Sequence, residues 1–177
     1  MSQHKKNISV KCKILLKNIL SYLFLSFLDK IFKIYVETTH CKCGVFLPKW
    51  DNKEEFGNAT RIFKVLNLTK NTLPRADLIF SRDLLVHLNF EDAFKVIANF
   101  KKSGATYLLT TTFVNRGLNE ELKETFWRVL NLQQPPFNFP KPILLVNEGC
   151  TEAGGLYSDK SLGLWLLKDI SLYPNSG

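Results

Sequence analysis

The chain has 177 residues, of which 45% are hydrophobic and 23% are charged. This length suits one domain and leaves little room for a second, and this composition is close to the globular average, so wholesale disorder is not expected. The formal net charge of +8 is concentrated at one end, because the first fifty residues hold nine basic and two acidic residues and the rest hold 15 basic and 14 acidic ones. Proteins that read nucleic acid usually spread positive charge over the folded domain, so no nucleic-acid partner is expected.

The first predicted unit, residues 1–56, is basic and contains an apolar stretch at 14–36. Its longest uncharged run is eleven residues, from Asn18 to Leu28, whereas a membrane-spanning helix needs about 20. Apolar residues at helical spacing predict an amphipathic helix that packs on a core or a partner, or lies on an anionic membrane surface. Export is a third interpretation, although no small-residue cleavage site follows. The expected location is cytoplasmic, with peripheral membrane association through residues 1–36 as the alternative.

The cysteines indicate reduced thiols. Four are present, which is too few for a disulfide framework in a chain of this length. Cys41 and Cys43 are separated by one lysine and lack a second Cys/His pair for zinc. No metal site is therefore expected.

The second predicted unit, residues 57–177, alternates strand and helix patterns. Runs rich in β-branched and aromatic residues predict strands over 61–67, 76–80 and 106–113. Between the last two lies a predicted helix over 90–102, with Asn89 as its N-cap and Glu91 and Asp92 in its first turn. A strand, helix and strand at this spacing predict a right-handed βαβ unit with parallel strands.

The chain then continues into a less regular part. A shorter helix is predicted over 119–129, followed by a proline-rich stretch at 134–142. Two further strands are predicted over 143–147 and 162–170, joined by a glycine-containing loop and paired antiparallel. These elements predict the α/β fold class.

Several segments of this unit carry a resemblance to a known family. Residues 67–74 read Asn-Leu-Thr-x-x-x-Leu-Pro, and residues 76–88 read Ala-Asp-Leu-Ile-x-Ser-Arg-Asp-x-Leu-x-His-Leu. Together with 103–112, 127–140 and 158–165, they resemble the class I S-adenosylmethionine-dependent methyltransferases over about residues 57–172. The resemblance implies a Rossmann-like three-layer sandwich whose seven-stranded sheet is parallel except for the last strand.

The same resemblance implies where S-adenosylmethionine would bind, and it assigns Gly44, Asn67, Leu68 and Ser81 to the cofactor. The family's glycine-rich turn corresponds here only to the stretch from His40 to Gly44, and no second strand ending in an acidic residue lies between 50 and 61. We therefore expect an incomplete methyltransferase sheet, in which the N-terminal half of the domain is missing, rearranged or replaced. A shifted reading frame is one way to produce this.

Three polar residues follow the predicted strand 76–80, where the carboxyl end of a parallel strand would place them at a ligand crevice. His87 is the candidate general base, because imidazoles titrate near neutral pH and a base assists transfer to a hydroxyl or ammonium. Asp83 is a second catalytic candidate, and Arg82 is a candidate to hold a carboxylate. The structural alternatives are a backbone hydrogen bond for His87, a cap for Asp83 and an ion pair for Arg82.

Three aromatic residues, Trp127, Phe137 and Phe139, are candidates to line the pocket of the methyl acceptor. The alternative is that they pack over the sheet.

The sequence supports two hypotheses for the function. The first is a methyltransferase-like protein for a small-molecule or glycan-type acceptor, whose degraded cofactor motif could leave it inactive. The second is a non-catalytic remnant or interaction subunit.

Overall fold

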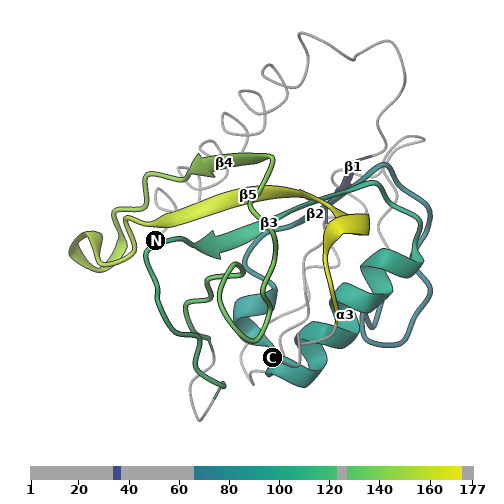
Figure 1. The fold of residues 1–177 in the computed structure, drawn as a ribbon, viewed down its shortest axis with the longest axis horizontal. Coiled ribbons are helices and arrows are strands. Elements are labelled where there is room, and N and C mark those ends of the chain that lie inside the picture. The colour runs from purple at the N-terminus through teal and green to yellow at the C-terminus, as the bar shows by residue number, and fades with distance from the viewer. Residues whose placement is uncertain (1–33, 37–65, 123–126, 173–177) are drawn as a thin grey trace, which may run out of the picture. The chain divides into compact units, whose positions relative to one another are not determined.

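A computed structural model describes residues 34–36 by their backbone, and residues 66–122 and 127–172 with their side chains (Figure 1). Its sheet has the order β1-β2-β3-β5-β4. The strands are β1 (Ile34–Val36), β2 (Leu78–Ser81), β3 (Tyr107–Phe113), β4 (Leu144–Asn147) and β5 (Lys160–Leu166). β1, β2 and β3 are parallel, whereas β5 runs antiparallel to both of its neighbours, β3 and β4. The predicted α/β class, the parallel pair and the antiparallel C-terminal pair are confirmed.

The helix α3 (Phe90–Lys102) has the predicted bounds and cap. The side chain of Asn89 accepts a hydrogen bond from the backbone N–H of Asp92 at 2.7 Å. Acidic residues occupy its first turn and lysines its last, as the helix dipole favours. Three short 3₁₀ turns complete the regular structure: η1 (Leu85–His87), η2 (Glu152–Gly155) and η3 (Leu167–Asp169).

Three predicted elements differ from the structure. Residues 61–65 lie outside the described part, and Leu66 and Asn67, which end the predicted strand 61–67, are not in a strand. The described ends of the predicted helix 119–129 are irregular, because Asn119 donates its side-chain amide to the carbonyls of Asn131 and Pro135 instead of starting a helix. The last predicted strand, 162–170, begins earlier and ends at Leu166, where the chain turns into η3.

The core lies between one face of the sheet and α3 (Figure 1). Ile79, Leu108 and Trp165 are neighbours across three strands and share this face. They belong to one cluster with Val96 and Ile97 of α3, all buried. An amphipathic helix packed on apolar strands is the expected way to bury both surfaces.

The opposite face of the sheet is also apolar. Leu78, Phe80, Leu109, Leu162 and Leu164 are all buried there. A three-layer sandwich would have helices on this face as well, but α3 on the first face is the one α-helix among the described residues. No helix in the described part of the chain is both long and apolar enough to cross a membrane. The predicted unit 1–56 lies outside this part except for β1.

Candidate functional site

Polar side chains gather at one edge of the sheet, where the carboxyl ends of β2, β3 and β4 meet. Arg82 and Asp83 follow β2, and Glu148 follows β4. Lys160 joins them because β5 runs in the opposite direction, which brings its first residue to this edge, opposite Phe113 of β3. The carboxyl edge of an open α/β sheet is where ligands usually bind.

Four of these charges form a closed ion-pair network. Arg82 Nε lies 2.6 Å from Glu148 Oε1, and Arg82 Nη1 lies 3.3 Å from Asp83 Oδ2. Lys160 Nζ lies 2.8 Å from the same Asp83 oxygen and 3.7 Å from Glu148 Oε2. The side chains of Glu148 and Lys160 are 7% and 12% exposed, so their charges are compensated mainly by Arg82 and Asp83 of the network rather than by water. The network joins three strands at their ends.

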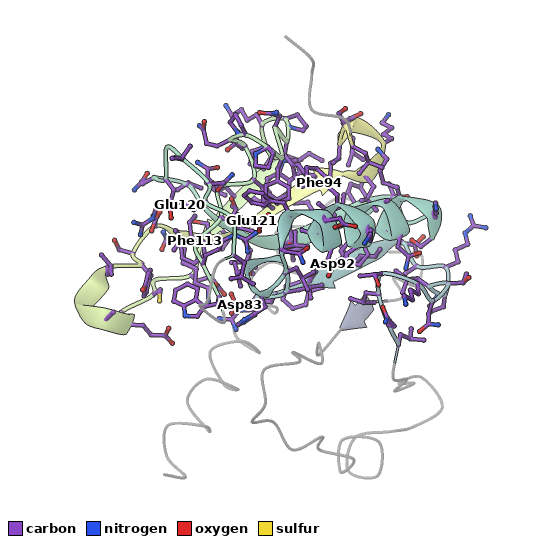
Figure 2. All side chains as sticks on the ribbon, turned by 90° about the horizontal axis from the view of Figure 1, so that it is seen from below. Asp83, Asp92, Phe94, Phe113, Glu120 and Glu121 are labelled. Carbon is purple, nitrogen blue, oxygen red and sulfur yellow. The ribbon has the colours of Figure 1, made fainter. Side chains whose placement is uncertain are left out.

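Asp83 is held in an unusual backbone conformation. Its φ of 56° lies in the left-handed region, which aspartate adopts more readily than most residues. Its backbone N–H donates to Thr111 Oγ1 at 2.9 Å, and the same hydroxyl donates to Asp83 Oδ1 at 3.3 Å. The turn after β2 therefore fixes the Asp83 carboxylate between β3 and Lys160 (Figure 2).

A cavity of about 210 Å³ opens at this edge. Its walls combine aromatic side chains with titratable ones: Asp83, Val86, His87, Phe113, Trp127, Cys150, Glu152, Tyr157 and Lys160. The aromatic wall is continuous, because the ring of Tyr157 meets Trp127 at 5.1 Å and Phe113 at 6.1 Å, both edge to face. Apolar walls with a few convergent polar groups are typical of small-molecule sites.

The structure brings together three of the predicted site residues. Asp83, His87 and Trp127 all line the cavity, although Trp127 comes from a different segment than the other two, which follow β2. Arg82 does not line it but holds Asp83 and Glu148 in place through its two ion pairs. Its predicted structural alternative, an ion pair, is therefore formed.

The residues assigned to the cofactor are not among the cavity's lining residues. Asn67 uses its side-chain oxygen within its own turn, where it accepts from the Thr69 N–H at 3.0 Å and the Thr69 hydroxyl at 2.7 Å. Leu68 is buried in the core against α3. Ser81 is 1% exposed, and its hydroxyl has no hydrogen-bond partner among the described residues. Gly44 lies outside the described residues.

Phe137 and Phe139 belong to the core and do not line the cavity. The two rings lie 6.4 Å apart, and Phe139 continues to Trp165 at 5.4 Å. Phe137 also packs against Phe94 of α3 at 5.1 Å. The alternative interpretation, packing over the sheet, therefore describes their position.

Lys160, Tyr157, Cys150 and Glu152 are cavity residues that sequence reasoning missed. They lie in or after the loop between β4 and β5, and only the reversed direction of β5 returns that loop to the carboxyl edge. A lysine at the start of a strand carries no local signal for such a site. The sequence feature that could have indicated these residues is the motif Ser-Asp-Lys at 158–160, which lies in one of the segments that resemble the methyltransferase family.

No group of histidine, cysteine and acidic side chains that would hold a metal ion occurs among the residues with described positions. No protein-family model, curated protein or solved structure matches the chain.

Proposed function

We propose that the chain is a methyltransferase-like protein that transfers a methyl group from S-adenosylmethionine to a small-molecule or glycan-type acceptor. The observation that carries the proposal is the sheet order. β5 is inserted between β3 and β4 and reversed relative to both, while the other strands run one way. A sheet that is parallel except for its last strand is what the resemblance implies, and the polar cavity lies at its carboxyl edge.

The described residues fit one part of the cofactor and not the whole. The cavity of about 210 Å³ is smaller than the roughly 300–1,000 Å³ of most ligand sites. Asn67 and Leu68 are committed to a turn and to the core. Asp83, in contrast, presents a carboxylate that suits the positive charge of a sulfonium. The bound cofactor would supply an activated methyl group at this point.

The residues of the cavity have distinct roles in this proposal. His87 is the group that accepts a proton from the acceptor hydroxyl or ammonium. Trp127 and Tyr157 hold the acceptor by ring contacts, which restricts its orientation as methyl transfer requires. Lys160 and Arg82 hold the Asp83 carboxylate in position through their ion pairs.

Calorimetric titration with S-adenosylmethionine tests the proposal. We expect binding heat at millimolar cofactor, and a loss of about tenfold in affinity in Asp83→Asn. Asparagine tolerates the same left-handed backbone, so the variant keeps the turn and removes the charge together with its ion pairs to Arg82 and Lys160. Asp92→Asn removes a carboxylate from the exposed first turn of α3 and should leave the affinity unchanged (Figure 2).

The absence of heat at millimolar cofactor would contradict the methyltransferase proposal. It would favour the second candidate, a non-catalytic interaction subunit. This candidate is supported by the positions of two residues assigned to the cofactor. Asn67 is hydrogen-bonded within its own turn and Leu68 is buried in the core, so neither is free to contact a cofactor. If the wild type and Asp83→Asn bind S-adenosylmethionine equally well, the cofactor does not bind at the Asp83 carboxylate in this cavity.

A further inference from the structure

The N-terminus of α3 binds a carboxylate that comes from another segment of the chain. The N-cap Asn89 satisfies the Asp92 N–H, whereas the Phe90 N–H donates to both carboxylate oxygens of Glu121, at 3.1 and 3.2 Å. Glu121 comes from the connection between β3 and β4, and Figure 2 shows it beside α3. Its side chain is 48% exposed. The first turn of a 13-residue helix thus already attracts an anion from elsewhere in the chain.

Arg128 lies beside this carboxylate and is fixed on several sides. Its backbone N–H donates to the Val86 carbonyl at 3.0 Å, and Nη1 donates to the Leu88 carbonyl at 2.6 Å. Its guanidinium lies 4.8 Å above the centre of the Phe90 ring. The side chain is 9% exposed, and this burial lowers the pKa of Arg128 while the charge of Glu121 opposes the change.

The guanidinium nevertheless keeps unused donors. Arg128 Nε and Nη2 are buried and have no hydrogen-bond partner among the described residues. The nearest Glu121 oxygen is 3.8 Å from Nη2, which is an ion-pair distance but too long for a hydrogen bond. Buried charged donors in folded proteins normally have partners. The Glu121 oxygens accept from the Phe90 N–H and, at Oε1, from the Leu122 N–H at 2.7 Å, and neither lies close enough to Arg128 to satisfy Nε and Nη2.

We propose that the Phe90 N–H together with Nε and Nη2 of Arg128 forms a binding site for a phosphate group, and that Glu121 is its internal competitor. A phosphate has three acceptor oxygens, so it can bond the amide and both unused guanidinium nitrogens at once. A carboxylate has two oxygens. Helix N-termini and arginine forks both commonly bind phosphate.

The site adjoins the cavity at the sheet edge. Val86, whose carbonyl fixes Arg128, and Trp127, which precedes it, both line that cavity. A small phosphorylated molecule would therefore place its phosphate at α3 and its uncharged part against the aromatic wall. This inference does not depend on S-adenosylmethionine, so a failure of the cofactor titration would not contradict the phosphate site.

Titration of the full chain with inorganic phosphate, followed by the amide resonance of Phe90 and by the phosphorus resonance, tests the site. The ionic strength is held constant with sodium chloride. We expect Glu121→Gln to bind phosphate at least about tenfold more tightly than the wild type, because the competing carboxylate is removed. Glu120→Gln makes the same charge change one residue away at an exposed position and should bind like the wild type.

Two further measurements test which residues and which ligand the site requires. Arg128→Met in the Glu121→Gln background should abolish phosphate binding, with the thermal unfolding transition showing whether the variant is folded. Acetate should bind Glu121→Gln more weakly than phosphate does. Equal gains in Glu121→Gln and Glu120→Gln, or no movement of the Phe90 resonance, would overturn the proposal even if the Arg128 variant does not fold. Acetate binding as tight as phosphate binding would overturn the assignment to phosphate.

Discussion

Gly163 shows how one residue of β5 determines the packing of the core. It lies opposite Thr110 of β3, on the same face as Trp165 two residues later. A Cβ placed on Gly163 would lie 2.1 Å from Cη2 and 2.4 Å from Cζ3 of the Trp165 ring. The ring is 1% exposed, and its Nε1 donates to the Pro140 carbonyl at 2.7 Å, so it cannot move aside freely. Glycine is required here for space, not for a special backbone angle.

Gly163→Ala should therefore destabilise the protein by about 1–3 kcal/mol, the range of overpacked cores. The free energy of unfolding, measured in urea, checks this value. Gly117→Ala is the matched control, because a Cβ at Gly117 meets nothing within 4 Å. In a Trp165→Phe background, Gly163→Ala should cost less stability than it does in the wild type, since the smaller ring leaves room. Equal stability of the two alanine variants would contradict this account.

Helix α3 is the element whose form depends least on its surroundings. Its cap, its charged ends and its apolar face all favour the same helix, and the predicted bounds are the observed ones. The connection between β3 and β4 is the opposite case. Asn119 there donates to backbone carbonyls as far as Pro135, which replaces the local hydrogen bonds of a helix. An apolar spacing in the sequence could not reveal that long-range bond.

Asn89→Ala should cost about 1 kcal/mol of stability, because the Asp92 N–H loses its acceptor at the N-terminus of α3. Asn89→Ser keeps an oxygen that can accept this bond and should retain most of the stability. Thermal unfolding of the three proteins in one buffer measures the difference. A loss of equal size in the serine variant would assign the effect to something other than capping.

At the scale of the whole molecule, the residues of the site do not contribute the excess positive charge. The charged side chains at the carboxyl edge of the sheet balance, with Arg82 and Lys160 against Asp83 and Glu148. The net charge of +8 comes almost entirely from the first fifty residues. We propose that these residues bring the chain to an anionic membrane surface, as basic segments do by electrostatic attraction.

Sedimentation with vesicles that contain phosphatidylserine tests this surface attraction. Binding is expected at low salt and should be lost at about 0.5 M salt, because screening shortens the reach of the charges. Replacing Lys5, Lys6, Lys11 and Lys13 by glutamine should weaken it. The matched control replaces four exposed lysines outside that segment and should keep binding: Lys70, Lys102, Lys141 and Lys168. Equal losses in both sets would contradict a role for the N-terminal segment.

The α/β class, the helix over 90–102 and the pairing of the last two strands can be predicted from the sequence alone, because local capping and apolar patterns act over short distances. Asp83, His87 and Trp127 can also be identified as candidates in this way. That these three share a cavity with Lys160 and Tyr157, and that Phe137 and Phe139 belong to the core, is visible only in the folded chain. The reason is that β5 runs opposite to β3, which brings residues distant in the chain to one edge of the sheet.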